Sequence, residues 1–342
     1  MRAVVGRRSV ATWLFMCAGF VLAMVVVGGL TRLTRSGLSI VDWKPITGVL
    51  PPLSHDAWLA EFARYQQSPE GRLVNTGMDL AGFQRIFFVE WAHRLLGRIT
   101  GVVVLLPFVW FVASGALRGA RALRVVGIFV LGGLQGAAGW FMVASGLVDR
   151  PHVSHLRLAL HLDLALLIFA LLLWVALDEV FGLRTGSLAP RPRGALSRPF
   201  AFTTLVLAAL TLTWGAFMAG LHAGHLAPTF PSMNGEVIPS GMALSSPLDL
   251  VNQPLVVHFA HRTLAYCTAA GALLTAWVTL TSAAPARARR AAMLLVLALV
   301  AQVGLGAWVV LAHVHIVAAT LHQANGVMVL GACVALLHGL RR

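Results

Sequence analysis

The sequence predicts an all-α membrane protein with eight transmembrane helices, arranged as two parallel-repeat four-helix bundles. Hydrophobic residues make up 58% of its 342 residues and charged residues only 11%, whereas a soluble globular domain carries roughly a quarter charged residues. This composition excludes a water-soluble fold, a disordered chain and a disulfide-stabilised scaffold. A spanning helix needs ~20 mostly apolar residues, so the roughly 198 hydrophobic residues suffice for about eight spans.

Hydropathy windows of about 19 residues place each of these helices. The opening segment MRAVVGRRSV resembles the start of a signal peptide. The apolar run after it is long, however, and leads into GGLTRLTRSG without a small-residue cleavage site, so we expect a retained first helix. The predicted spans are 12–31, 87–112, 124–144, 157–177, 200–221, 255–281, 290–311 and 316–338.

The net charge of +14 is spread between the apolar runs instead of gathering on one soluble face. This distribution argues against a nucleic-acid partner. If the N-terminus is cytoplasmic, 15 of the 26 Lys and Arg residues fall in inner segments, as expected for cytoplasmic loops. We therefore predict that both termini are cytoplasmic. The three cysteines lie within apolar runs and predict no disulfide.

An internal repeat divides the chain into two halves. EWAHRLLGRITG at 90–101 matches HFAHRTLAYCTA at 258–269, which places His93 over His261, and LQGAAG from Leu134 matches AQVGLG from Ala301 in nearly the same register. SGLS at 36–39 matches AGHL at 223–226 in a wider register, so the first outer loop carries about 19 extra residues. The segment PRPRGALSRP resembles a linker. We expect residues 1–185 and 186–342 to form the two four-helix halves.

Four of the 13 histidines lie near the outer ends of predicted spans, two in each half: His93, His161, His261 and His322. A single histidine in a span is more often a hydrogen-bonded packing residue, but four at repeat-related positions favour a functional role. Two imidazoles on neighbouring helices can bind a haem iron from both sides. The simplest hypothesis is therefore one haem site in each half.

The residues around these histidines make the two sites unequal. Glu90 lies three residues before His93 and hence on the same helix face, whereas the repeat places His258 at the equivalent position. Arg94 and Arg262 follow the paired histidines, where they could bind haem propionates or contact lipid headgroups instead. A second pair, Gln135 and Gln302, each precede a glycine by four residues and are expected to join neighbouring helices.

At this point the chain resembles the haem A synthase family over nearly its whole length. The segments that carry the resemblance are GGLTRLTRSGLSIVDWKPITGVLPP, EWAHRLLGR, LQGAAGWFMVASGL, RLALHLDLAL, AGLHAG with TFPSMNG, HFAHRTLAY and LHQANG. The resemblance implies an enzyme that oxidises a methyl group of haem O to the formyl group of haem A, by successive hydroxylations and loss of water. It also implies a multi-pass protein of the bacterial inner membrane.

The resemblance assigns roles to residues at matching positions. His261 and His322 would ligate the iron of a cofactor haem b, which transfers electrons. The catalytic set would be Glu90 with His93 and His161, the two histidines that would bind the iron of the substrate haem. Expected partners are haem O synthase (protohaem farnesyltransferase), cytochrome oxidase assembly factors and an electron donor such as ferredoxin.

The chain departs from the family pattern at His222, Ala227, Pro228 and His258, and it lacks the cysteine pair that one branch carries in the first outer loop. A change of ligand to His258 therefore stays open at this stage. Two other functions are compatible with parts of this pattern. A di-haem b-type electron-transfer membrane subunit would need the same ligands, whereas a transporter is disfavoured because the histidines lie near one surface instead of the midplane.

Overall fold

The computed structural model describes residues 2–44, 47–148, 151–182 and 197–341. Their regular secondary structure is helical, and an isolated bridge between Met233 and Glu236 is the only β-pairing among them. Eight of the helices are long and apolar enough to cross a membrane, which confirms the eight predicted spans. The predicted boundary between residues 185 and 186 lies outside the described residues.

Each of the eight long helices covers one predicted span to within one residue, and most extend beyond the apolar window at one or both ends. They are α1 (Arg2–Leu33), α4 (Leu80–Ala113), α5 (Ala120–Leu147), α6 (His155–Phe181), α7 (Ser197–Gly220), α9 (Pro254–Thr281), α10 (Ala286–Leu311) and α11 (Ile316–Gly339).

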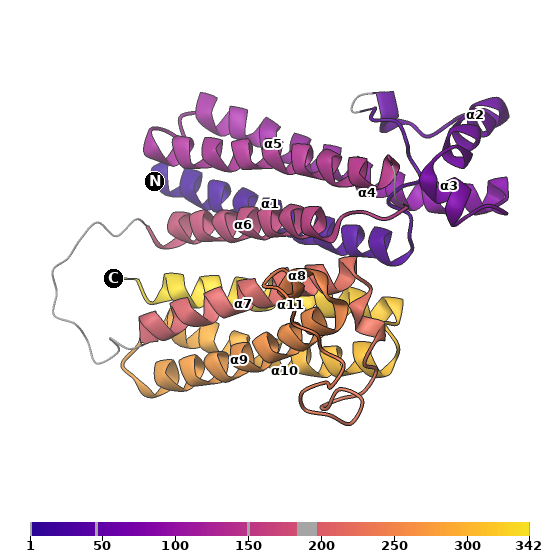
Figure 1. The fold of residues 1–342 in the computed structure, drawn as a ribbon. Helices are drawn as coiled ribbons and strands as arrows, with labels where there is room; N and C mark the ends of the chain where they lie inside the picture. The colour runs from indigo at the N-terminus through magenta and orange to yellow at the C-terminus, as the bar shows by residue number, and fades with distance from the viewer. Residues whose placement is uncertain (1, 45–46, 149–150, 183–196, 342) are drawn as a thin grey trace.

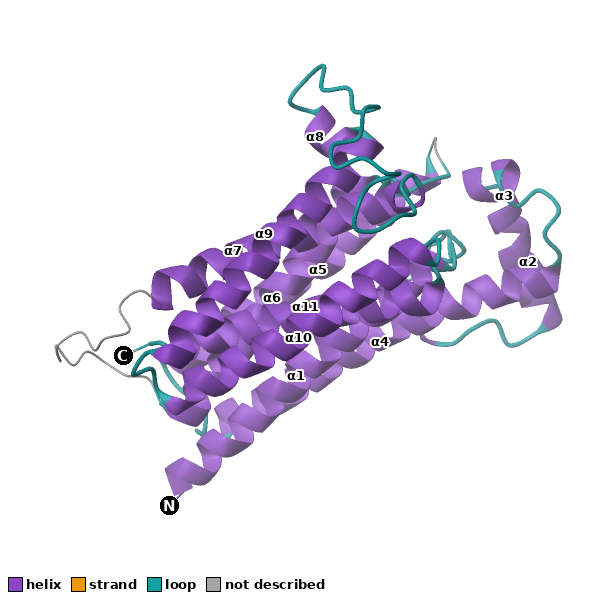
Figure 2. Ribbon diagram, turned by 90° about the horizontal axis from the view of Figure 1, so that it is seen from below, coloured by secondary structure: helices purple, strands orange, loops and turns teal. Residues whose placement is uncertain are grey.

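Short helices lie in the two long loops. The first loop contains η1 (Thr47–Val49), α2 (His55–Gln66) and α3 (Pro69–Leu73), and the second contains η2 (Ala223–His225) and α8 (Asp249–Asn252). Figure 2 shows these loops at one end of the bundle, with residues 2 and 341 toward the other. We call these the loop end and the terminal end.

The long helices form two groups of four (Figure 1). In the first group α1 packs on α4 and α6, and α5 packs on α6; in the second, α7 packs on α9 and α11, and α10 packs on α9 and α11. The groups meet where α6 contacts α7 and α11, and where α1 contacts α11. One apolar core includes Leu166 and Phe169 of α6 together with Leu330 of α11, so it continues across this boundary.

Proline determines how α4 is attached to α1. Pro107 lies inside α4, and because proline has no N–H it leaves the carbonyl of Val103 without its helical donor. The indole Nε1 of Trp13 on α1 donates to that carbonyl at 2.9 Å. The Trp13 ring also contacts the Phe111 ring, with centroids 5.4 Å apart. A backbone group inside the bilayer is thereby satisfied by the neighbouring helix.

Candidate functional site

The four predicted histidines lie near the loop end, each on a different long helix. His161 and His322 are six residues into α6 and α11, and His261 is seven residues into α9. At 1.5 Å per residue this places each about two turns from the helix start. His93 is thirteen residues into α4 because that helix begins earlier, at Leu80. The structure thus confirms that the histidines cluster toward one end of the bundle.

Each histidine ring lies against a glycine of the neighbouring helix. A Cβ added to Gly28, Gly139 or Gly306 would come within 3.0–3.1 Å of a ring Cε1, and one added to Gly215 within 3.3 Å. Such distances are at or below the limit of ordinary carbon contacts. Glycine is therefore what permits the close approach of ring and helix at all four sites. The pairs are Gly28 with His93, Gly139 with His161, Gly215 with His261 and Gly306 with His322.

The rings are arranged in two pairs. His161 lies near enough to His93, and His322 to His261, for the charge of one ring to act on the other. Sequence analysis placed the same residues together, one pair in each half. The structure therefore brings both predicted pairs together.

Glutamines orient two of the four rings. The amide of Gln135 on α5 donates to the backbone carbonyl of His161 at 3.0 Å and lies 3.2 Å from the ring Nδ1. Gln302 on α10 makes the same contacts with His322, at 3.1 and 3.2 Å. These bonds join α5 to α6 and α10 to α11, which is the helix-joining role predicted for both glutamines.

The two remaining rings differ in how they are oriented. Nδ1 of His261 lies 3.0 Å from the backbone carbonyl oxygen of Thr211, so this nitrogen donates and Nε2 keeps a free lone pair. Nδ1 of His93 is buried and has no hydrogen-bond partner. In a metal-binding histidine, one ring nitrogen usually binds the metal while the other donates its N–H to a carbonyl. His261 is arranged in this way.

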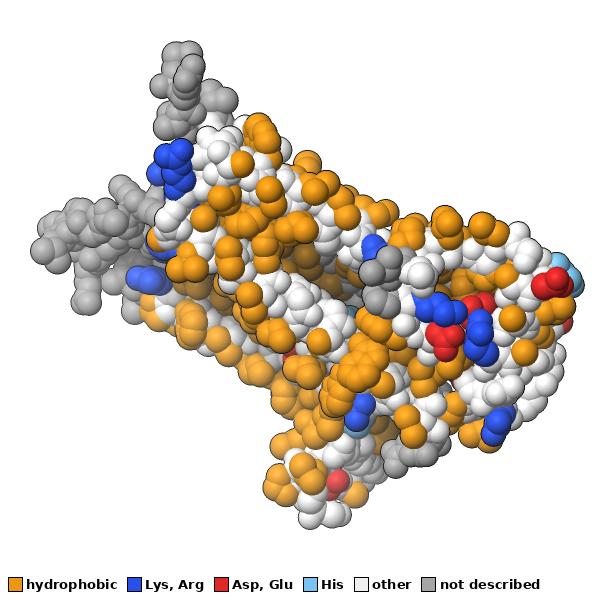
Figure 3. All heavy atoms as spheres, turned by 90° about the horizontal axis from the view of Figure 1, so that it is seen from above, with side chains coloured by type: hydrophobic (Ala, Val, Ile, Leu, Met, Phe, Trp, Pro, Cys, Tyr) orange, Lys and Arg blue, Asp and Glu red, His pale blue; other side chains and the backbone are white. Residues whose placement is uncertain are grey.

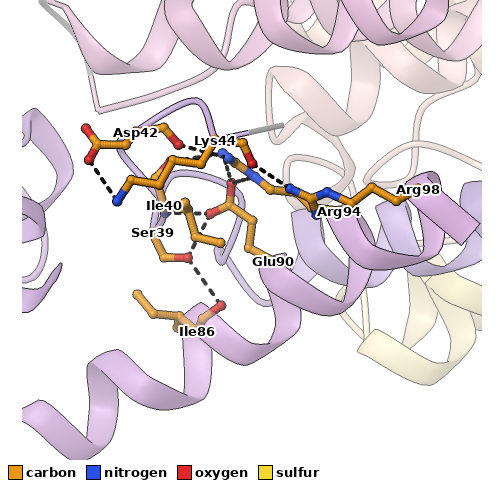
Figure 4. A network of polar contacts seen from close by, with 8 residues as sticks. All are labelled: Ser39, Ile40, Asp42, Lys44, Ile86, Glu90, Arg94 and Arg98. Carbon is orange, nitrogen blue, oxygen red and sulfur yellow. Dashed lines mark hydrogen bonds and ion pairs between the residues drawn. The ribbon is translucent and has the colours of Figure 1, made fainter. Parts of the chain in front are cut away.

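Glu90 is buried at the base of the first loop, with 2% of its surface exposed. Figure 4 shows its carboxylate surrounded by donors. Oε2 accepts hydrogen bonds from the Ser39 hydroxyl at 2.7 Å and from the Ile40 backbone N–H at 2.8 Å. Oε1 accepts two from the Arg94 guanidinium, at 2.7 and 3.1 Å. Charge-assisted bonds of this kind are the strong ones, so the carboxylate is fixed in one orientation.

Arg94 and Arg262 bind the loops by closely similar contacts. Beyond Glu90, Arg94 donates to the backbone carbonyls of Ile40 and Asp42, at 2.9 and 3.2 Å. Arg262 donates to the carbonyls of Ala227, Thr229 and Ser232, at 2.7, 2.8 and 3.1 Å. Both guanidiniums thus join a loop to a long helix. Their predicted contact with haem propionates stays a prediction.

His258 occupies the position in α9 that Glu90 occupies in α4 relative to the following arginine. Its Nε2 accepts a hydrogen bond from Nε of Arg262 at 3.0 Å, and the ring is fully buried. That lone pair is therefore engaged by the arginine that binds the second loop. Asp163 accepts a hydrogen bond from Thr213 at 3.0 Å and so joins α6 to α7.

Some residues of the site were missed by sequence analysis. Ser39 lies in a segment that the repeat singled out, but its bond to Glu90 requires knowledge of how the loop folds back. Thr211 contributes a backbone carbonyl, for which no side-chain pattern exists. Gly28 and Gly215 could have been found, because they are related by the same register that aligns SGLS at 36–39 with AGHL at 223–226.

Comparison with known proteins identifies the family of this chain. A family model described as "Cytochrome oxidase assembly protein" matches residues 11–334. The chain belongs to this family. It is 48% identical to the heme A synthase of Rhodospirillum centenum, over 99% of this chain and 90% of that protein. It is 43% identical to the heme A synthases of Sphingopyxis alaskensis, over 98% of this chain and 92% of that one, and of Parvibaculum lavamentivorans, over 98% and 95%.

Membership of the cytochrome oxidase assembly family confirms the resemblance that the motifs indicated. The match covers both histidine pairs, Glu90 and both loops. Each helix and loop described above therefore belongs to the segment that the family shares. The roles of the individual residues do not follow from that membership.

Proposed function

We propose that this chain is a haem A synthase, an oxidoreductase that acts on haem O and oxidises one of its methyl groups to the formyl group of haem A. The observation that carries the proposal is the inequality of the two histidine pairs. A buried carboxylate, Glu90, lies one helical turn from His93, and His258 stands at the matching place near His261. One pair therefore suits a haem on which chemistry is performed, and the other suits a resident cofactor.

The residues present fit a haem in each half. Each half offers two imidazoles on two of its long helices near the loop end, and a glycine beside each ring keeps the adjacent helix close without blocking it. His261 keeps a free Nε2 because its Nδ1 is bonded to the Thr211 carbonyl. We assign His261 and His322 to a haem b. When bound, haem b would supply one-electron transfer, and two histidines would suit that role as its ligands.

In the substrate half, we assign His93 and His161 as ligands of the substrate haem iron. We assign Glu90 as the residue that supplies negative charge. Four donated hydrogen bonds fix the Glu90 carboxylate before substrate binds. A charge that is already oriented stabilises positive charge developing on the substrate without reorganisation. Arg94 acts through Glu90 as a positioning residue. Nδ1 of His93 has no hydrogen-bond partner, whereas Nδ1 of His261 is bonded to a carbonyl. The orientation of the His93 ring is therefore less restricted than that of the His261 ring.

The arrangement of the chain in the membrane follows from the same proposal. We infer that the segments before and after the linker are two related halves, because Arg94 binds loop carbonyls at positions 40 and 42 and Arg262 binds those at 227 and 229, which the sequence repeat aligns with them. The distribution of Lys and Arg supports cytoplasmic termini and an outward loop end. We place the protein in the bacterial inner membrane, with haem O synthase, oxidase assembly factors and a ferredoxin-type donor as its partners.

Purified protein tests the proposal through its haem content. Replacing His261 or His322 by alanine should remove the b-type absorption, because the cofactor loses an axial ligand. Glu90→Gln should retain the haem b spectrum and abolish conversion of haem O, since the amide keeps the shape and removes the charge. Extracted haem, separated by chromatography, reports the product.

The matched control is Glu236→Gln, which neutralises an exposed carboxylate in the second loop. It should leave both spectrum and product at wild-type levels. Full conversion of haem O by the Glu90→Gln protein would contradict the role given to Glu90. Two stable b haems with no haem A product in the wild type would identify a di-haem electron-transfer subunit instead.

A further inference from the structure

The two halves differ in how their second and third spanning helices pack. In the second half α9 and α10 lie in contact along the bundle, but α4 and α5 form no comparable interface. The described contact between them is a pair of rings near the terminal end, Phe108 of α4 and Phe129 of α5, with centroids 4.6 Å apart. α4 is otherwise fastened to α1 and to the first loop. The first half is therefore open on the side where α4 and α5 face each other.

Glycines lie above the ring contact on both helices. Gly101 is seven residues before Phe108, while Gly132 and Gly136 are three and seven residues after Phe129. These spacings put each glycine on the same helix face as its phenylalanine. A Cβ on any of the three would meet no neighbouring heavy atom within 4 Å. These three glycines are exposed, so a strip without side chains, which we call the slot, runs from the phenylalanine pair toward His93, fifteen residues and about 22 Å along α4.

The second half has larger side chains at the corresponding positions. The repeat that aligns His93 with His261 relates Gly101 to Ala269, and the one that aligns Leu134 with Ala301 relates Gly132 to Leu299 and Gly136 to Val303. Leu299 is buried in the apolar core of the second half, and Ala269 packs against that core. Two of the three corresponding positions are therefore packed in the half assigned to haem b, whereas Val303 is 47% exposed.

We propose that the slot between α4 and α5 holds the farnesyl-derived tail of haem O and is the route by which this substrate reaches His93 and His161 from the bilayer. This inference rests on the proposed function. Haem O carries a long isoprenoid tail that haem b lacks, so only the substrate half needs an open side. The route stays within the apolar span, where a hydrocarbon tail is as well solvated as in lipid.

The surface around the slot has the character that such a substrate requires. Figure 3 looks onto the side of the molecule that carries α4 and α5: hydrophobic side chains cover the helices, and charged ones gather at the two ends. Leu105 of α4, three residues before Phe108 and so on the same helix face, is exposed. The phenylalanine pair closes the slot toward the terminal end. The tail therefore has an apolar path bounded at its inner end.

The test fills the slot with the residues that the second half carries. A variant combining Gly132→Leu and Gly136→Val, reconstituted in lipid nanodiscs with haem b bound, is titrated with haem O and with tail-free protohaem. We expect haem O affinity to fall at least tenfold, because the tail has no place, while protohaem still binds and the haem b absorption stays at the wild-type level. Gly101→Leu, from the opposite wall, should act in the same direction and serves if the double variant loses haem b.

Gly127→Leu is the matched control. Gly127 is also on α5 and also has open space around it, but it lies two residues before Phe129 and so on the opposite side of the helix. It should bind haem O as the wild type does. Unchanged haem O affinity in the slot variants would overturn the proposal, and so would an equal loss of haem O and protohaem binding at full haem b content. Failure of the proposed function is separate, because it would show as no haem A from the wild-type protein.

Discussion

Glycine determines how closely each histidine ring approaches the helix beside it, and this can be tested separately in the two halves. Gly306→Ala places a Cβ 3.0 Å from Cε1 of His322, and Gly139→Ala places one equally close to His161. Each substitution should tilt its ring. We expect Gly306→Ala to shift and weaken the haem b absorption several-fold, and Gly139→Ala to leave that spectrum intact while lowering haem O conversion.

The control for this prediction is Gly304→Ala, two residues from Gly306, where a Cβ meets nothing within 4 Å. Its haem b spectrum should equal that of the wild type. The assignment of the two pairs would be wrong if Gly139→Ala removed haem b and Gly306→Ala did not.

At the same scale, the sequence predicts chemistry-bearing side chains better than their partners. Glu90 and the four histidines stand out because charged or ionisable residues in apolar segments are costly and hence rare. The donors that fix Glu90 do not stand out: Ser39 and the Ile40 N–H reach it only because residues 34–44 fold back against α4 at Glu90. Contacts that depend on how a loop folds carry no periodic signal.

Among the elements, hydropathy found the spans and missed the helices outside the apolar core. α4 begins at Leu80, seven residues before the predicted start, and α2 and α3 were not predicted at all. These segments lie where water replaces lipid, so apolar length carries no information about them. Helix-capping residues do carry such information. The side chains of Ser54, Ser68 and Asp79 each accept a hydrogen bond from a backbone N–H at a helix start, and such residues are a sequence signal for helix initiation.

The first loop contains a carboxyl group whose protonation should control its stability. Glu70 in α3 is 5% exposed and accepts a hydrogen bond from the Tyr65 hydroxyl. Burial raises the pKa of Glu70 from 4.5 to about 7; the charge of Glu90 adds to this rise, and Arg35 opposes it. The folded loop thus retains a proton that the unfolded loop releases, so its stability falls as pH rises between these two values.

We expect residues 55–75 to unfold locally more readily at about pH 8 than at about pH 5, by up to about 3 kcal/mol. Hydrogen exchange of these amides, corrected for the intrinsic effect of pH, measures the change. Glu70→Gln should flatten the dependence by keeping the group neutral, whereas Glu236→Gln in the second loop should preserve it. Protection that is independent of pH in the wild type would contradict the prediction.

For the whole molecule, the composition predicts the number of spans and the repeat predicts the grouping, but neither predicts how the two groups of helices are joined. They are joined by apolar packing of α6 and α1 on α11 and by polar side chains at the terminal end. These polar contacts involve residues near helix ends, where charge is common. A functional or structural role is therefore not distinguishable there without the fold.

Asp178 of α6 is the centre of the polar contact between the groups. Its carboxylate, 4% exposed, accepts hydrogen bonds from Arg124 of α5 at 3.2 Å, from His338 of α11 at 3.0 Å and from Arg341 at 2.7 Å. Removing one partner of a buried charge network costs about 3–5 kcal/mol. Asp178→Asn should therefore lower the midpoint of thermal unfolding by several degrees, followed through the haem b absorption and through intrinsic fluorescence.

Glu179→Gln is the comparison that distinguishes a polar contact between the two groups of helices from one within a single group. Glu179 is the next residue of α6 and pairs with Arg121 of α5 at 2.5 Å, so its ion pair lies inside the first group. We expect both variants to be less stable, but only Asp178→Asn to resolve two transitions, because loss of the bond to α11 allows the second group to retain haem b after the first has unfolded. A single transition in both variants would show that apolar packing alone couples the two groups, and that Asp178 adds stability without joining them.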